Sequence, residues 1–379
     1  MIRIVFVTTG LEVGGAEVML LNLLTALNKE EFEPIVISIG KKGPMGEKIS
    51  GLGIPVHSIG LNLNRPDPMA GMKFYRIIKR VNPDLMQGWM YHGNFAVQAV
   101  KFLLKRKIPV IWSIHHTVNN LRSEKWLTAQ LIRICGRWSH LPANIHYVSE
   151  ISAESHERIG YASDKRVVLA NGFDLDKNAP SRENREWVRK ELGLSEDTLI
   201  VGLVARFHPM KDHPNFIRAA GLLNQSNPHV HFLMAGQDVD EQNIDLVELR
   251  NSLGLKERMH MLGLRNDSSR LIASLDILST SSSFGESFPM VVGEAMASAV
   301  PCVVTDIGGS GFLVGETGRV VPPGNAQALA DAWNEILTMN SLEREHLGER
   351  ARERVAEYFS LQSMTRKYEA LYLESIKRS

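Results

Sequence analysis

Short apolar segments alternate with helical segments along nearly the whole chain, and this alternation constrains the fold more than any other feature. The first apolar segment, residues 2–8, leads through Gly10 into a helical pattern over about residues 15–27, and the alternation starts again at residues 199–205. Because parallel strands need crossover helices between them, this order predicts doubly wound α/β sheets. A chain of 379 residues exceeds one usual core, so we expect two Rossmann-like domains.

The boundary between these domains is predicted from turn-forming residues. The segment NGFDLDKNAP at 171–180 is rich in them, and it indicates a first domain over 1–178 and a second over 179–360. The two parts also differ in charge. Residues 1–170 carry 21 Lys and Arg against 13 Asp and Glu, whereas the remainder carries 22 against 29. This asymmetry suggests that the two domains have different partners.

Two carboxylates, Glu286 and Glu294, fall in the stretch 279–309, which we interpret as a strand, a loop and a helix over 289–299. Pro289 suits the first turn of a helix, where its missing N–H is harmless. Glu286 then lies on a loop at the carboxyl end of a strand, and Glu294 lies on the helix behind it. The free amides near Met290 and Val291 lie at the positive end of this helix, and they favour an anion such as phosphate.

Two further positions suit phosphate groups. Arg206 and Lys211 follow the strand predicted over 199–205, and a guanidinium and an ammonium a short loop apart can hold a diphosphate. Gly14 and Gly15 open the first helix and let the backbone approach a ligand closely. A nicotinamide site is the rival interpretation of this glycine pair. It fails because the spacing is not G-x-G-x-x-G and because the second strand ends without the acidic residue that would bind a ribose.

Four motifs, taken in order, resemble the landmarks of the retaining glycosyltransferase family 4 over nearly the whole chain. They are GLEVGGAE at 10–17, NGFD at 171–174, ARFHPMK at 205–211 and the E-x7-E spacing from Glu286 to Glu294. The resemblance implies the GT-B fold, in which two Rossmann-like domains face a central cleft. In that fold the C-terminal helix, here 361–379, returns to the N-terminal domain. Two departures are Pro289, where family members often have glycine, and Ala299, where a glycine commonly ends the helix.

The same resemblance implies a role for individual residues. Arg206 and Lys211 would stabilise the departing diphosphate, Glu286 would hold the hydroxyls of the donor sugar, and Glu294 would accept from the ribose hydroxyls. His115 aligns best with a histidine that family members carry beside the donor sugar, and His116 stays open as the alternative. The implied catalytic residues are His115, Arg206, Lys211 and Glu286. The implied donor-binding residues are Gly14, Gly15, Arg206, Lys211, Gly263, Leu264, Glu286, Phe288, Met290, Val291 and Glu294.

We therefore expect a retaining enzyme that moves a sugar from a nucleotide diphosphate donor, with UDP as the expected nucleotide, to a saccharide or lipid-linked saccharide acceptor. Such a reaction would serve cell-surface polysaccharide or glycoconjugate synthesis. No cofactor or metal is expected, since fixed cations and helix N-termini would meet the phosphates; Asp238 and Asp240 lie in an acidic loop without further ligands. Two alternatives stay open, a nucleotide-sugar epimerase and a non-catalytic sugar-nucleotide binding protein.

The composition favours a cytosolic protein. No stretch approaches the roughly 18 unbroken apolar residues of a membrane span, and residues 1–10 read as a first strand and not as a signal peptide. Two predicted helices are basic and partly apolar, and we expect a peripheral contact between them and an anionic membrane, on the inner face of the plasma membrane. The residues concerned are Lys73, Arg76, Lys79 and Arg80 in the first helix and the segment 100–107 in the second. No nucleic acid partner is expected.

Overall fold

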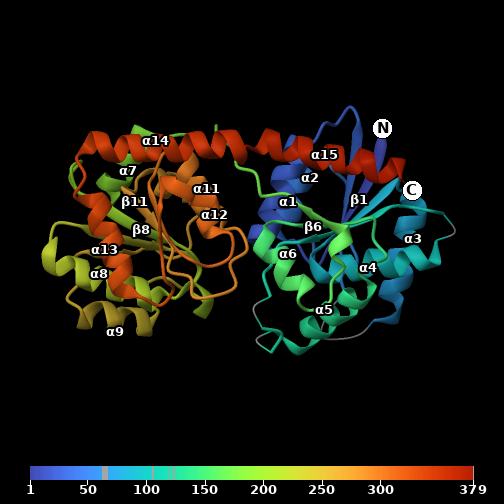
Figure 1. Cartoon of the computed structure of the whole chain (residues 1–379), viewed down its shortest axis with the longest axis horizontal. Coiled ribbons are helices and arrows are strands. Elements are labelled where there is room, and N and C mark those ends of the chain that lie inside the picture. The colour runs from blue at the N-terminus through green and yellow to red at the C-terminus, as the bar shows by residue number, and fades with distance from the viewer. Residues whose placement is uncertain (62–66, 105, 119, 123, 379) are drawn as a thin grey trace. The chain divides into compact units, whose positions relative to one another are not determined.

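The computed structural model of the chain describes residues 1–61, 67–104, 106–118, 120–122 and 124–378. The chain folds into two compact units (Figure 1). Unit 1 comprises Met1–Gly172 and Leu361–Ser379, and unit 2 comprises Phe173–Ser360. Of the positions singled out in the sequence, Lys105 in the second basic segment and Ser379 at the end of the last helix lie outside the described residues.

Unit 1 is built on a seven-stranded parallel sheet with the strand order β3-β2-β1-β4-β5-β6-β7. The direction in which strands are added reverses between β1 and β4. Loops that leave neighbouring strands at such a switch point diverge, so ligands of open α/β sheets bind there, beyond the carboxyl ends of the strands. The strands are β1 Ile2–Thr8, β2 Phe32–Ser38, β3 Val56–Ser58, β4 Leu85–Trp89, β5 Val110–Ile114, β6 Asn144–Tyr147 and β7 Arg166–Val168.

Helices cover the sheet of unit 1, and the last helix of the chain is one of them. The Tyr372 ring on α15 meets the rings of Phe6 and Phe32 edge-on, with centroids 6.2 and 5.9 Å apart. Tyr372 is fully buried, so the C-terminal helix is part of this core. The helices are α1 Gly15–Ala26, α2 Gly43–Gly51, α3 Pro68–Val81, α4 Met90–Leu103, α5 Trp126–Trp138, α6 Glu150–Glu157 and α15 Leu361–Lys377.

Unit 2 repeats the design on a six-stranded parallel sheet with the order β10-β9-β8-β11-β12-β13. Its switch point lies between β8 and β11. The strands are β8 Ile200–Val204, β9 His231–Ala235, β10 Met259–Met261, β11 Ile277–Ser279, β12 Cys302–Thr305 and β13 Arg319–Val321. The helices are α7 Arg182–Glu191, α8 His213–Ser226, α9 Ile244–Ser252, α10 Ser268–Ala273, α11 Met290–Ala297, α12 Ser310–Val314, α13 Ala326–Leu337 and α14 Ser341–Tyr358. None of the described helices of either unit is both long and apolar enough to span a bilayer.

The division between the units falls after Gly172, a few residues before the boundary that turn-forming residues predicted at 178. The physical reason lies in Phe173. Its ring stacks on Phe288 with centroids 6.2 Å apart, and its amide donates to the Phe359 carbonyl at 2.9 Å. A Cβ atom at Gly293 would lie 2.0 Å from this ring, so a glycine is required there. The segment that reads as a linker is therefore already packed into unit 2 from its third residue.

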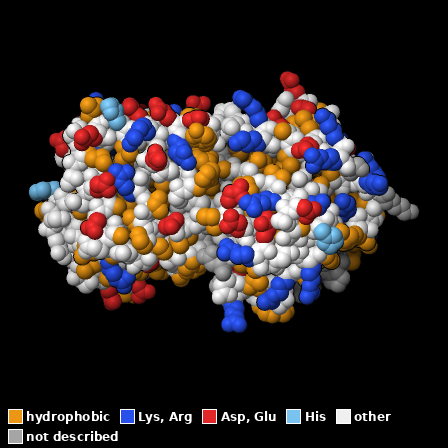
Figure 2. All heavy atoms as spheres, viewed as in Figure 1, with side chains coloured by type: hydrophobic (Ala, Val, Ile, Leu, Met, Phe, Trp, Pro, Cys, Tyr) orange, Lys and Arg blue, Asp and Glu red, His pale blue; other side chains and the backbone are white. Residues whose placement is uncertain are grey.

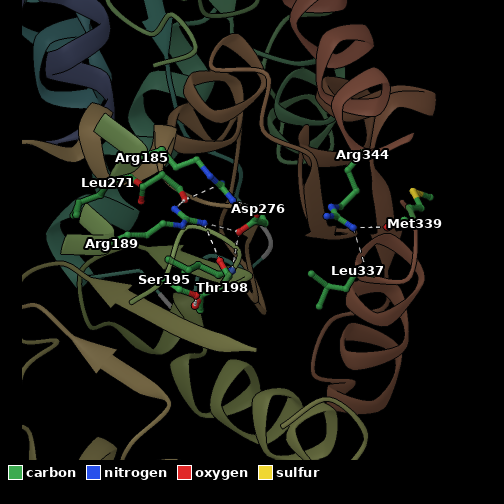
Figure 3. Close-up of polar contacts among 11 residues, drawn as sticks. Arg185, Arg189, Ser195, Thr198, Leu271, Asp276, Leu337, Met339 and Arg344 are labelled. Carbon is green, nitrogen blue, oxygen red and sulfur yellow. Dashed lines mark hydrogen bonds and ion pairs between the residues drawn. The ribbon is translucent and has the colours of Figure 1, made fainter. Parts of the chain in front are cut away.

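A buried ion pair ties α7 to the sheet of unit 2 (Figure 3). Arg189 on α7 donates to Asp276 Oδ2 at 2.9 Å, and Arg185 donates to Asp276 Oδ1 at 2.8 Å. Asp276 also accepts from the Ile200 amide at 2.8 Å, at the start of β8. Breaking such a buried, hydrogen-bonded pair costs about 3–5 kcal/mol because it strands an unpaired charge. This contact fixes the first helix of unit 2 to the central strands that carry the site.

Helix α11 follows the sequence prediction with small differences at its ends. It runs over Met290–Ala297 with Pro289 as the N-cap residue, inside the predicted 289–299. Ala299 adopts a left-handed conformation with φ of 56°, the position after a helix that usually favours glycine. The Val300 amide closes the helix end by donating to the Ala295 carbonyl at 2.9 Å. The departure from the family pattern at Ala299 therefore leaves the helix end intact.

Candidate active site

Two loops meet at the switch point of the unit 2 sheet, one after β8 and one after β11. The first carries one turn of 3-10 helix, Pro209–Lys211, and the second is the serine-rich run that follows Ser279. Ser281 Oγ donates to the Lys211 carbonyl at 2.8 Å, and the Ser283 amide donates to the Met210 carbonyl at 2.9 Å. These bonds fix the two loops to each other, so the side chains that they carry keep a defined separation.

Lys211 and Glu286 form an ion pair at this junction. Lys211 Nζ contacts Glu286 Oε1, and Ser282 Oγ donates to the same oxygen at 2.8 Å. The two side chains are 18% and 9% exposed, so both charges are largely removed from water and each stabilises the other. The sequence predicted both residues for the site, but it did not predict their contact or the role of Ser282. The run of serines after the strand was the available signal for the latter.

A third loop, after β12, closes over the backbone of Glu286. The Gly309 amide donates to the Ser287 carbonyl at 2.9 Å. Gly308 has φ of 59°, and a Cβ atom there would lie 1.8 Å from the Glu286 carbonyl oxygen, so no other residue fits without moving the loop. Glu286 is thus held from three sides, by the Lys211 loop, by Ser282 and by the glycine pair at the end of the stretch 279–309.

Two further groups that attract anions lie on the segments that carry this pair. Arg206 is exposed at the carboxyl end of β8, and no carboxylate among the described residues pairs with it. The N-terminus of α11 has no side-chain cap and no acidic residue in its first turn, so the amides of Met290 and Val291 point outward without a side-chain acceptor. Free amides and the helix dipole attract anions. The Arg206 guanidinium, the Lys211 ammonium and the start of α11 are therefore the groups of these loops that suit a diphosphate.

Glu294 lies one helical turn inside α11 and is partly buried. No hydrogen bond reaches its carboxylate from the described residues. Burial raises the pKa of Glu294 to about 7, and Lys177 opposes this shift with a smaller effect. A carboxylate with this environment gains from any hydroxyl donor that a ligand brings, because a hydrogen bond favours its charged form.

The implied base-binding backbone at Gly263 is already engaged. The Gly263 amide donates to the Val239 carbonyl at 2.8 Å, and the Gly263 carbonyl accepts from the Gly236 amide at 2.8 Å. Leu264 is the next residue, and its side chain is exposed. The backbone of Leu264 is therefore more accessible to a nucleotide base than that of Gly263. The Phe288 ring packs against Phe173 and is 5% exposed, which leaves its backbone, and not its ring, for a donor.

At the switch point of unit 1, Gly14 is the N-cap residue of α1 and Gly15 is the first residue of that helix. A Cβ atom at Gly14 would lie 2.4 Å from the Glu17 carboxylate, so this acidic side chain folds back over the helix start. The glycine pair was predicted to approach the donor diphosphate. The N-terminus of α1 carries the Glu17 carboxylate in its first turn, which makes it a poorer anion site than the start of α11.

The two candidate histidines follow β5 and have different surroundings. The His115 ring stacks on Trp89 with centroids 4.4 Å apart, and both its nitrogens are buried without a hydrogen-bond partner. Burial, and then His146, hold the pKa of His115 well below its usual range. His116 Nε2 contacts Glu124 at 2.8 Å, a partner that the sequence did not indicate. Of the two, His115 has unused hydrogen-bonding capacity, and it carries no charge near neutral pH.

Comparison with known proteins agrees with this geometry. The family model "Glycosyl transferases group 1" matches residues 184–354, and the model "Glycosyltransferase Family 4" matches residues 13–177. The chain is similar to an N-acetyl-alpha-D-glucosaminyl L-malate synthase of Bacillus anthracis, with 26% identity over 314 residues, 80% of this chain and 78% of that protein. It is 31% identical over 152 residues, 40% of this chain and 39% of the other, to UDP-Gal:alpha-D-GlcNAc-diphosphoundecaprenol alpha-1,3-galactosyltransferase of Escherichia coli.

Solved structures share the fold. Anabaena Alr3699/HepE in complex with UDP superposes with a TM-score of 0.84 at 21% identity, over 98% of this chain and 100% of that one. The sucrose-phosphate synthase of Thermosynechococcus elongatus gives a TM-score of 0.80 at 18% identity, over the whole of both chains. The two family models together extend over most of the chain, and the two parallel sheets are those of GT-B structures. The chain therefore belongs to glycosyltransferase family 4 and is a glycosyltransferase with the GT-B fold.

Proposed function

We propose that the chain transfers a hexose from a UDP-sugar, with retention of configuration, to a saccharide or lipid-linked saccharide acceptor. The observation that carries this proposal is the Lys211 and Glu286 ion pair at the switch point of unit 2, beside Arg206 and the uncapped start of α11. This arrangement offers fixed positive charge to a diphosphate and a carboxylate to a sugar. A nucleotide-sugar epimerase and a non-catalytic binding protein, the alternatives that the sequence left open, gain no support from a transferase family.

The ion pair suggests how the donor is received. In the free protein Lys211 neutralises Glu286, and a diphosphate brings a stronger negative partner for the ammonium. As Lys211 turns to the phosphates, Glu286 becomes free to accept hydrogen bonds from the hydroxyls of the donor sugar. Arg206 adds a planar fork that suits two phosphate oxygens at once. Both cations then stabilise the charge that develops on the leaving diphosphate, so the proposal uses no metal.

The names of the relatives support the donor and acceptor classes. HepE has been solved with UDP and with UDP-glucose, and the relative from Escherichia coli is named for a UDP-linked donor and a diphosphoundecaprenol-linked acceptor. Glu294 would accept from the ribose hydroxyls of such a donor. A lipid-linked acceptor would place the reaction in cell-surface polysaccharide or glycoconjugate synthesis.

A peripheral contact with an anionic membrane is part of the proposal, in a form narrower than the sequence suggested. Arg76, Lys79 and Arg80 are exposed on α3. Lys73 instead donates to the Ser58 and Ile59 carbonyls at 2.9 and 2.8 Å. Phe74 and Ile78 of α3 are buried in unit 1, whereas Met69 and Met72 are exposed, so this helix offers a membrane its charge and two apolar side chains.

Ligand-induced thermal stabilisation tests the donor. A ligand that binds only the folded state raises its stability by mass action, so UDP and UDP-sugars should raise the melting temperature of the protein. GDP, ADP and their sugars serve as matched controls that differ in the base. Stabilisation by a GDP- or ADP-sugar without stabilisation by any UDP-sugar would reject the proposed donor.

A further inference from the structure

Unit 1 contains an apolar groove at the carboxyl edge of its sheet. It has a volume of about 380 Å³ and lies between the N-terminal half of α3 and helix α4, beyond the ends of β2 and β3, and Leu131 of α5 also lines it. Pockets of a few hundred Å³ are typical of small-molecule sites. Its walls are hydrocarbon except for His92 at the start of α4. The groove belongs to neither the ion pair of unit 2 nor the histidine stack of unit 1.

Small residues keep the groove open. Ala70 and Gly71 line it from α3, and Ala96 and Ala99 line it from α4. A Cβ atom added at Gly71 would meet no atom within 4 Å. Close packing of helix on sheet normally fills such space with larger side chains. Here four positions on two helices leave it unfilled, which is the arrangement expected of a surface that receives an apolar partner.

The two helices that flank the groove carry charge of one sign. Helices α3 and α4 contain no Asp or Glu, but they carry Lys73, Arg76, Lys79, Arg80 and Lys101. None of these five pairs with a carboxylate among the described residues. Lys73 is anchored to carbonyls at the end of β3, next to Ile59, which lines the groove. Figure 2 shows Lys and Arg side chains at many places on the surface that unit 1 forms.

The apolar surface continues outward from the groove. Leu103 lines it and is 65% exposed, and Phe102 beside it is 59% exposed. Met69, at the start of α3, is 65% exposed. A ligand longer than the groove could therefore contact these exposed apolar side chains with the part that extends beyond it. A compact apolar ligand would not use these side chains, whereas a chain would.

We propose that this groove binds the isoprenoid chain of a polyprenyl phosphate-linked acceptor, with Lys73, held beside Ile59 at the edge of the groove, available to the phosphate groups. The carboxyl edge of the sheet is where an open α/β domain binds its ligand. Hydrocarbon walls match the chain, and Lys73, which pairs with no carboxylate among the described residues, matches the anionic head. The inference rests on the proposed function, since it names the lipid class of that acceptor, but it concerns residues that the donor does not need.

Farnesyl diphosphate, below its micelle-forming concentration, is the probe. Its binding is measured by calorimetry with UDP present at saturation, so that the cations of unit 2 are occupied. We expect binding by wild type, and at least about 100-fold weaker binding of dimethylallyl diphosphate, because each buried methylene contributes about fourfold in affinity. Equal affinity for the two diphosphates, or none for farnesyl diphosphate, overturns the proposal.

Two variants fill the groove from opposite walls, and a third is the matched control. Gly71→Leu and Ala99→Leu should each weaken farnesyl diphosphate at least tenfold. Gly51→Leu adds the same side chain at another helical glycine of unit 1 with open space around it, and it should leave affinity unchanged. Thermal stabilisation by UDP in all three shows that they are folded. Wild-type affinity in both groove variants removes the groove from the acceptor site.

These experiments distinguish a wrong donor from a wrong assignment of the groove. If UDP fails to stabilise wild type, the proposed donor is wrong, and loss of farnesyl diphosphate affinity in Gly71→Leu and Ala99→Leu, but not in Gly51→Leu, still reports on the groove. If the groove variants lose binding to phosphatidylglycerol vesicles but keep full affinity for farnesyl diphosphate, the groove holds a bilayer lipid, and the acceptor proposal is overturned.

Discussion

The switch points of the two sheets have the same topology and opposite chemistry. In unit 2, between β8 and β11, an ion pair, a free guanidinium and an uncapped helix start converge. In unit 1, between β1 and β4, the glycine helix start is covered by Glu17, and the nearby His115 is neutral and stacked on Trp89. Unit 1 has an apolar groove between α3 and α4, two helices that carry Lys and Arg but no Asp or Glu. One fold can thus present a diphosphate site or an apolar site, depending on which side chains its loops and helices carry.

This difference in chemistry also sets how each half responds to change. In the site of unit 2, replacing one charged side chain leaves its partner charge unpaired and away from water, which is costly. Binding of an anionic ligand there should therefore depend on single side chains. The buried histidines of unit 1 are neutral. Acid that protonates them should therefore lower the free energy of unfolding of unit 1. The predictions below would break or sharpen this contrast.

The largest effect is expected from the two cations of unit 2. Arg206→Ala and Lys211→Ala should each weaken UDP binding by about 10- to 150-fold, since a hydrogen bond to a charged group contributes about 1.5–3 kcal/mol. Turnover should fall further, because the leaving diphosphate gains charge in the transition state. Calorimetry with UDP measures the first effect. Arg218→Ala, on the exposed side of α8, is the control. Unchanged UDP affinity in both Arg206→Ala and Lys211→Ala would mean that these two cations do not bind the diphosphate.

The two carboxylates should separate in steady-state kinetics. Glu286→Gln should lower kcat by about 100-fold or more, because the proposed contact of this carboxylate with the sugar acts as charge develops. Glu294→Gln should mainly raise the KM for the donor, since its proposed contact with the ribose would be the same in the ground and transition states. Activity of Glu286→Gln equal to wild type would mean that the pair with Lys211 is only structural.

Acid should destabilise unit 1 through its buried histidines. His156 Nδ1 donates to the Ser152 carbonyl at 2.7 Å, and burial lowers the pKa of His156 to about 4 from 6.5. Between these values the unfolded chain binds the proton and the folded unit does not, so the free energy of unfolding should fall by about 2–3 kcal/mol as pH drops from 6.5 to 4. Urea unfolding at several pH values measures this slope. His156→Gln should flatten the slope, and His57→Gln, on the surface, should not.

Glu294 should give unit 2 the opposite pH dependence. Its folded pKa of about 7 lies above the ordinary value of 4.5, so the folded unit binds the extra proton, and stability should fall as pH rises from 4.5 to 7. Glu294→Gln should therefore stabilise the ligand-free protein at pH 8 by about 1–3 kcal/mol and have little effect at pH 4. Melting curves at both pH values decide this. Equal effects at the two pH values would mean that Glu294 is solvated.

Much of the fold could be predicted because it depends on local pattern. Alternating apolar and helical segments specified two parallel sheets, and the position of Pro289 specified the start of α11 to within a residue. Glu286 was placed on a loop and Glu294 on the helix for the same reason. The GT-B fold and the family followed from motifs in a fixed order.

What the sequence could not predict depends on contacts between distant residues. Lys211 and Glu286 are 75 positions apart, and only the folded loops show that the two charges neutralise each other. Gly263 stays a predicted base-binding residue, and only the folded structure shows that its amide donates to Val239 and its carbonyl accepts from Gly236. The apolar groove is the clearest case, because space left by Ala70, Gly71 and Ala99 is a property of packed helices. No single segment signals an unfilled volume.

The smallest effect is expected for the membrane contact of unit 1. Arg76, Lys79 and Arg80 are exposed, and each cation near an anionic surface contributes about 1 kcal/mol at low salt. Changing these three to Gln should weaken co-sedimentation with phosphatidylglycerol vesicles at low salt, and high salt should weaken it in wild type. Lys29, Lys41 and Lys48 changed to Gln form the control, since they remove equal charge elsewhere on unit 1. If both triple variants lose vesicle binding equally, the binding depends on the net charge of unit 1 and not on helix α3. The enzyme would then reach its acceptor without a defined membrane-binding surface.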